Sequence, residues 1–158
     1  MRIAKEAGIP NGSLFTYFET KAALFNQLYL ELKTEMATAA MKDVQAHEYD
    51  REYFFEVWRN WTNWAATHPE KRKALAQLNV SDQILPETRA AAHKAMRPLG
   101  EVLERSRAAG PMCKVPISFV SMLLNSVAEG TMEYMIQDPE NAKKHCKVGF
   151  DAVWRMIA

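Results

Sequence analysis

The sequence predicts an all-α fold, and three observations support this prediction. Apolar residues recur at intervals of three and four along most of the 158 residues, as in helices that bury one side. Pro or Gly stands between these stretches, for example at His68-Pro69, Gly110-Pro111 and Asp138-Pro139, where helices begin or end. No segment shows the strict alternation expected of a half-buried strand. We expect a small part, residues 1–42, followed by a larger helical bundle, residues 43–158.

The first expected element is a pair of short helices in residues 2–18. Gly8 follows an apolar face at one-turn spacing, where a helix ends, and Pro10 fits the first turn of the next helix. Leu14 and Phe18 then face back toward the first helix. Two helices this short bury little alone, so we expect the crossed pair of a helix-turn-helix, with a plain surface turn as the alternative.

The second helix of such a pair presents its N-terminal residues to the major groove of DNA. The outward residues here are small or able to form hydrogen bonds, which suits close approach to phosphates and base edges. These candidate DNA-binding residues are Asn11, Gly12, Ser13, Thr16 and Tyr17.

Residues 3–25 read Ile-Ala-Lys-Glu-Ala-Gly-Ile-Pro-Asn-Gly-Ser-Leu-Phe-Thr-Tyr-Phe-Glu-Thr-Lys-Ala-Ala-Leu-Phe. This stretch closely resembles the DNA-binding signature of TetR-family transcriptional regulators. That family's pattern runs Ile-Ala, Ala-Gly-Val, Gly-x-Leu-Tyr-x-Tyr/His-Phe and Ser/Thr-Lys-x-x-Leu. The resemblance covers only the start of the chain, and it implies a dimeric regulator of the repressor type whose helical ligand-binding domain controls operator binding.

The chain departs from that pattern in two ways. Phe15 stands where the family usually has Tyr, so a phosphate-contacting hydroxyl is absent there, and Tyr17 partly compensates. The family also has a further helix before its Ile-Ala, whereas this chain starts at Met1. We therefore expect residues 1–18 to be frayed and operator binding to be weak or lost. The alternative function is a dimeric helical sensor or interaction module that does not bind DNA.

Residues 20–42 are expected to form one helix with Thr20 as its N-cap. Lys21 lies in the first turn, where the helix dipole disfavours a cation. A nearby DNA phosphate would offset that cost, and the resemblance implies such a contact; an ordinary exposed lysine is the alternative. Because this helix leads from the DNA-binding end into the larger part, it is the natural lever between them.

After a polar loop at 43–50, residues 53–65 are the most aromatic stretch of the chain. Their rings share one helical face, which either packs in the core or lines a cavity for a small apolar or aromatic effector. The candidate pocket residues come from several helices: Phe54, Trp58, Trp61, Met96, Leu103, Phe119, Met122 and Asn125.

Four further helices are expected, at 69–80, 86–109, 116–137 and 139–157, with a kink at Pro98 and with Asp138 capping the last one. Residues 116–137 are apolar on more than one face, so that helix needs two partners. The last two helices are therefore expected to form a homodimer interface with their symmetry mates, as the resemblance also implies. A pair packed only within the chain is the alternative.

The sequence shows little sign of catalytic or metal chemistry. His47, His68, His93 and His145 lie on separate segments, and Cys113 and Cys146 complete no ligand set. No nucleophile setting or phosphate-binding Gly loop occurs. With a net charge of +1 and no signal peptide or membrane-length apolar run, we expect a cytoplasmic protein without cofactor, metal or membrane contact that is not an enzyme.

Overall fold

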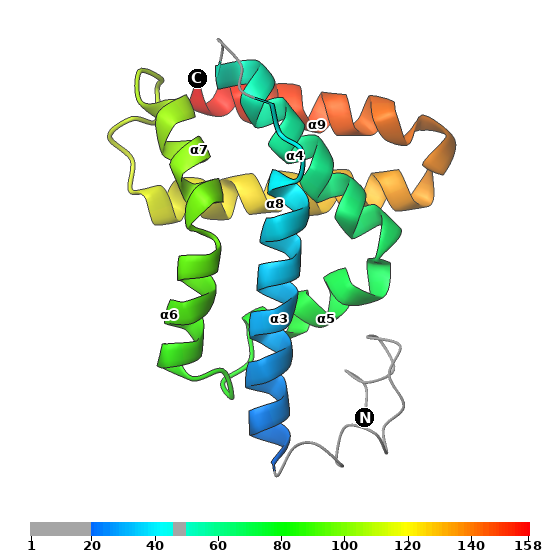
Figure 1. Ribbon diagram of the computed structural model, residues 1–158. Helices are drawn as coiled ribbons and strands as arrows, with labels where there is room; N and C mark the ends of the chain where they lie inside the picture. The colour runs from blue at the N-terminus through cyan, green and yellow to red at the C-terminus, as the bar shows by residue number, and fades with distance from the viewer. Residues whose placement is uncertain (1–19, 46–49) are drawn as a thin grey trace. The chain divides into compact units, whose positions relative to one another are not determined.

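The computed structural model describes residues 20–45 and 50–158, and every regular element within them is a helix (Figure 1). The predicted all-α fold is therefore confirmed. The helices are α3 (Lys21–Met41), α4 (Asp50–Thr67), α5 (Pro69–Asn79), α6 (Pro86–Ala95), α7 (Arg97–Arg107), α8 (Ile117–Gln137), the short 3-10 helix η1 (Pro139–Asn141) and α9 (Ala142–Ile157).

The chain divides into two compact units that interleave along the sequence. Unit 1 comprises Met1–Thr38 and His68–Arg97, and unit 2 comprises Ala39–Thr67 and Pro98–Ala158. The chain passes between the units within α3, at the α4–α5 junction and at the start of α7. The predicted division into residues 1–42 and 43–158 separates a DNA-binding part from a ligand-binding part, whereas these two units are defined by compactness. The functional division stays a prediction.

In unit 1, polar side chains tie α3 to the segments around α5 and α6. The Thr20 hydroxyl accepts a hydrogen bond from the Ala23 backbone N–H at 3.0 Å, which confirms the predicted cap. The Asn26 amide donates to the Gln83 carbonyl at 2.8 Å and accepts from the Leu85 N–H at 2.9 Å. One side chain thus satisfies a carbonyl and an N–H of the loop before α6, where the backbone has no helical partners.

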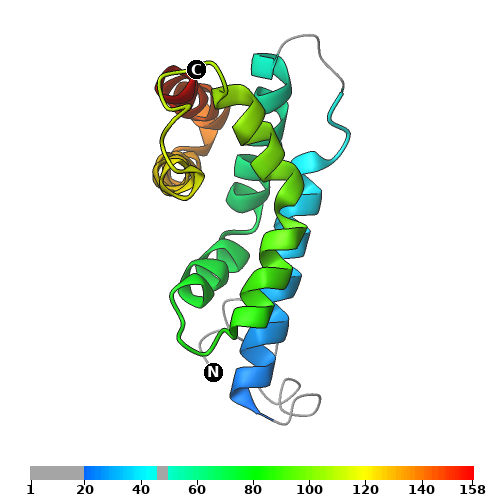
Figure 2. The same cartoon turned by 90° about the vertical axis from the view of Figure 1, so that its left-hand side faces the viewer.

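In unit 2, α4 packs against both α8 and α9, which follow each other and lie side by side (Figures 1 and 2). Phe150 of α9 is 1% exposed and is surrounded by aromatic rings. Its ring centroid lies 5.7 Å from that of Phe54 and 5.0 Å from that of Phe55. Trp58 is fully buried and donates its indole N–H to the Cys146 carbonyl at 3.0 Å. The aromatic face of α4 is therefore packed in the core.

The α8–α9 pair is close because a glycine faces a small side chain. A Cβ atom built at Gly149 would overlap the side chain of Thr131 on α8. The Thr131 hydroxyl donates to the Val127 carbonyl of its own helix at 2.8 Å, so its position is fixed. Only glycine fits at position 149 without moving one of the two helices.

Two element boundaries differ from the prediction. The expected 86–109 helix is two helices separated at Met96, because Pro98 has no N–H to donate to the carbonyl of residue 94. The predicted kink is confirmed at this break. The last helix begins at Ala142 rather than at Pro139, because Asp138 does not cap it with its side chain. Its carboxylate instead accepts hydrogen bonds from the Asn141 amide and pairs with His145 at 2.9 Å.

Candidate functional site

The predicted DNA-binding residues have different outcomes. Asn11, Gly12, Ser13, Thr16 and Tyr17, with the expected fraying of residues 1–18, lie outside the described residues. Lys21 is described: it is the exposed first residue of α3, and its ammonium lies 5.4 Å from the centre of the Phe25 ring. The first turn of α3 carries no acidic residue. The positive end of the helix dipole and the Lys21 ammonium therefore act together on an anion.

A second candidate site is the outer face of α8 and α9, the side that is not packed against α4. It carries large apolar side chains whose exposed fractions are 52% for Phe119, 67% for Met122, 60% for Tyr134 and 60% for Val148. A Cβ atom built at Gly130 of α8 would meet open space. Exposed apolar side chains around a small residue are typical of a surface that another helix pair can cover.

The structure separates the eight predicted pocket residues into three environments. Phe54, Trp58 and Leu103 are buried, and Trp61 lies against Trp58 with ring centroids 5.8 Å apart. Met96 is half-buried at the α6–α7 junction and belongs to unit 1. Phe119, Met122 and Asn125 are exposed on α8 and are not brought together with the buried rings. A shared apolar cavity among the eight stays a prediction.

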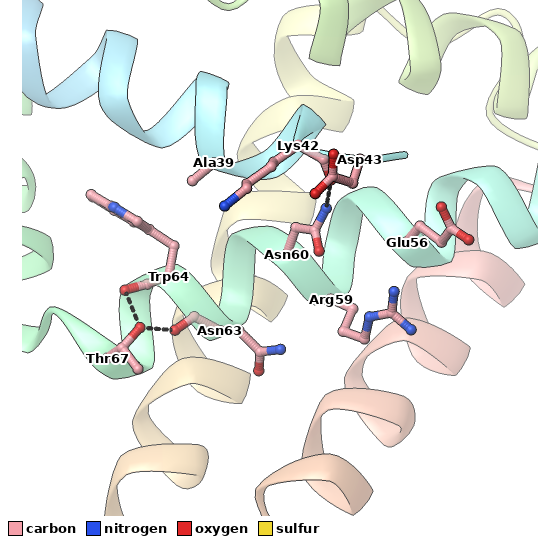
Figure 3. A pocket seen from close by; sticks show the side chains of 9 residues that line it. All are labelled: Ala39, Lys42, Asp43, Glu56, Arg59, Asn60, Asn63, Trp64 and Thr67. Carbon is pink, nitrogen blue, oxygen red and sulfur yellow. Dashed lines mark hydrogen bonds between the residues drawn. The ribbon is translucent and has the colours of Figure 1, made fainter. Parts of the chain in front are cut away.

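Unit 2 instead contains a polar groove of about 530 Å³ between the end of α3 and α4 (Figure 3). None of the predicted pocket residues lines it. The groove holds two cations, two carboxylates and two amides beside one indole ring, and the lining residues are Ala39, Lys42, Asp43, Glu56, Arg59, Asn60, Asn63, Trp64 and Thr67. Its volume lies within the ~300–1,000 Å³ of sites that bind small molecules.

Hydrogen bonds fix the groove's shape. The Asn60 amide donates to the carbonyls of Ala40 at 3.1 Å and Lys42 at 2.9 Å, so it satisfies the end of α3 and holds it against α4. Asp43 follows with a φ of 54°, a left-handed conformation that Asp tolerates better than most residues. The Glu56 carboxylate accepts the Gln45 backbone N–H at 2.9 Å.

The sequence carried a signal for this groove. Glu56, Asn60, Asn63 and Thr67 follow one another at intervals of three and four on α4, so they form a polar stripe beside the aromatic one. The pocket predicted from the sequence rests on the aromatic stripe alone. The contribution of α3 is separated from this stripe by a loop and could not be inferred from periodicity.

Residues 1–28 match the model of the tetR family of bacterial regulatory proteins. A solved structure from Shewanella sp. PV-4, described as a transcription regulator of that family, superposes with a TM-score of 0.77 at 26% identity. The match covers 98% of this chain and 84% of that one. The start of the chain thus matches the DNA-binding part of TetR-family regulators, and its fold matches that of a protein described as one.

The structure of a protein of unknown function from Rhodococcus sp. RHA1 shares the fold of this chain. Its TM-score is 0.72 at 18% identity, over 98% of this chain and 82% of that one. The matched residues 1–28 include all six predicted DNA-contacting positions. Among the described helices, none is both long and apolar enough to span a membrane. The described residues also contain no cluster of three or more potential metal ligands.

Proposed function

We propose that this TetR-family regulator is a dimeric repressor that binds operator DNA and releases it when a small-molecule effector binds. The observation that carries the proposal is the match of residues 1–28 to the family model. That segment contains the residues predicted to face the major groove of DNA. It extends into α3, where Lys21 lies at the positive end of the helix dipole. A DNA phosphate at this position is attracted both by the Lys21 ammonium and by the positive end of the helix dipole.

Dimerisation through α8 and α9 is the second part of the proposal. The exposed side chains of Phe119, Met122, Tyr134 and Val148 give these two helices an outer apolar face in addition to their packed inner one. A two-fold axis would set this face against itself and bury the apolar side chains of both copies. A dimer would place two recognition helices at a fixed spacing, as two successive major grooves require.

Effector control is the third part. A ligand changes the operator affinity only if it binds the DNA-competent and the DNA-incompetent arrangements with different affinity. Helix α3 is the element that would transmit this difference, since it starts at Lys21 beside the DNA-binding segment and ends in unit 2. An apolar effector among the aromatic side chains is the version predicted from the sequence. A repressor of this kind works in the cytoplasm, where its operator lies.

The test is selection of bound duplexes from a random DNA library, followed by affinity measurements on the selected sequence at several salt concentrations. We expect specific binding that is weak, in line with the departures from the family pattern, and that weakens further with salt because phosphate contacts release counterions. Lys21→Gln should lower the salt slope by about one per contact that is lost. Light scattering of the same protein should give twice the 18.0 kDa chain mass.

Lys114→Gln is the matched control, because Lys114 is also an exposed lysine but lies in the α7–α8 connection. It should leave the salt slope unchanged. A dimer that selects no sequence and shows no salt-dependent DNA binding would contradict the repressor proposal. That result would favour the alternative, a dimeric small-molecule sensor without DNA binding.

A further inference from the structure

We propose that the polar groove between the end of α3 and α4 binds a small zwitterion, and that this zwitterion is the effector. The inference rests on the proposed function for its regulatory part and on the groove's own chemistry for its binding part. It names the effector as a molecule of amino-acid or dipeptide size with one carboxylate and one ammonium group. This effector differs in chemistry and in place from the apolar effector that the aromatic stripe predicts.

The charges of the groove are balanced in a way that selects such a ligand. Lys42 and Asp43 are consecutive residues of the turn that follows α3, and Glu56 and Arg59 are one turn apart on α4. The turn after α3 and helix α4 therefore each contribute one cation and one carboxylate. A ligand of a single charge would meet repulsion from one pair of groups as well as attraction to the other. A zwitterion can place its carboxylate near the cations and its ammonium near the carboxylates.

The groove is also organised before any ligand arrives. Asn60 holds the end of α3 through two backbone carbonyls, at 3.1 and 2.9 Å, and the Gln45 N–H orients the Glu56 carboxylate at 2.9 Å. Trp64, which is 7% exposed, supplies a rigid wall. Preorganised polar groups lose little entropy on binding, so a small ligand can be held by few contacts.

The position of the groove along the chain suggests its regulatory role. Ala39 is the first residue of unit 2 on α3, and Thr67 is the last residue of α4 before the chain enters unit 1. The groove therefore borders two of the connections between the units. A ligand that contacts both connections and binds one of their conformations more tightly shifts the equilibrium toward that conformation. Helix α3 would transmit this change toward Lys21.

The binding part is tested by calorimetry on the full chain with glycyl-L-phenylalanine as the probe. Its N-acetyl form lacks the ammonium, and its C-terminal amide lacks the carboxylate. We expect saturable binding of the zwitterion and an affinity about tenfold weaker for each capped form, since each loses one charge-assisted contact. Equal affinities for all three forms, or no saturable binding of any, would overturn the assignment.

Two substitutions assign each charge to its partner. Lys42→Met keeps the aliphatic stem and should weaken the zwitterion and the N-acetyl form about tenfold, while it leaves the amide unaffected. Asp43→Asn tolerates the same left-handed backbone and should weaken the zwitterion and the amide instead. Lys114→Met, a control away from the groove, should change none of the three. Binding that is insensitive to both groove substitutions would place the ligand elsewhere and refute the inference.

The regulatory part is tested on the selected operator. The zwitterion should lower the operator affinity of the wild type and of Lys114→Met, and it should lose this effect in Lys42→Met. If the protein binds its operator but the zwitterion does not change that affinity, the effector assignment fails and the repressor proposal stands. If the zwitterion binds as described but no operator exists, the repressor proposal fails and the groove remains a zwitterion site.

Discussion

The inner and outer faces of the helices in unit 2 differ in how they are filled. On the inner side, Phe54, Trp58 and Phe150 pack ring against ring and are at most 4% exposed. On the outer side, Phe119 of α8 is 52% exposed, and α4 turns polar residues toward a groove. Burial of apolar surface is what stabilises a single chain. The inner face therefore accounts for folding, and the outer surfaces of unit 2 are those available to a second copy or a ligand.

The largest expected difference is between two variants that each remove a phenylalanine, one from the inner face and one from the outer face. Phe150→Ala should lower the free energy of unfolding by about 3–5 kcal/mol, because it empties a fully enclosed aromatic site. Phe119→Ala should lower it by less than about 1 kcal/mol and should weaken self-association instead. Urea unfolding at one fixed chain concentration and sedimentation measure these two effects. Equal losses of stability from the two substitutions would remove the distinction between the faces.

Glycine provides a second matched pair with a smaller effect. Gly149→Ala should destabilise by about 1–3 kcal/mol, because its Cβ would overlap the Thr131 side chain and push α9 from α8. Gly130→Ala should be neutral or stabilising by up to about 1 kcal/mol, since that Cβ meets open space and Ala favours the helix. Thermal unfolding of both variants checks the prediction. A stabilising Gly149→Ala would show that the two helices can separate without cost.

The same contrast explains how much of this molecule could be predicted from its sequence. Periodicity reports which residues avoid water, so it identified the helices, and residue chemistry identified the Thr20 cap and the break near Pro98. Periodicity does not show whether an apolar side chain is buried within its own chain or stays exposed until a partner covers it. For that reason the pattern groups Phe119 and Met122 with Phe54 and Trp58, although the structure leaves Phe119 and Met122 exposed.

The groove was missed for a related reason. Its cations and carboxylates come from the end of α3 and from the polar side of α4, which the 43–50 segment separates in sequence. A polar stripe on a helix usually faces solvent. Only the fold shows that Asn60, in the polar stripe of α4, holds the end of α3 against α4. The start of α9 was misplaced because Asp138 bonds side chains instead of a free backbone N–H.

The smallest expected effect concerns that corner between α8 and α9, which is polar and exposed. Hydrogen bonds from His145 and then from Asn141 hold the pKa of the Asp138 carboxyl below its ordinary value. A carboxyl with a lowered folded-state pKa contributes stability that is fully present above its unfolded pKa of about 3.9. That contribution is lost as the pH falls through the folded-state pKa.

Asp138→Asn should therefore cause a slight loss of stability near neutral pH, and the difference from wild type should shrink as the pH is lowered below about 4. Denaturant unfolding across this acid range measures it, with Glu140→Gln, a change at an exposed neighbouring carboxylate, as the matched control. The loss should be far smaller than that from Phe150→Ala, since exposed charged pairs contribute little. A loss as large as that of Phe150→Ala would mean that this polar corner, and not the aromatic inner face, holds α9 in place.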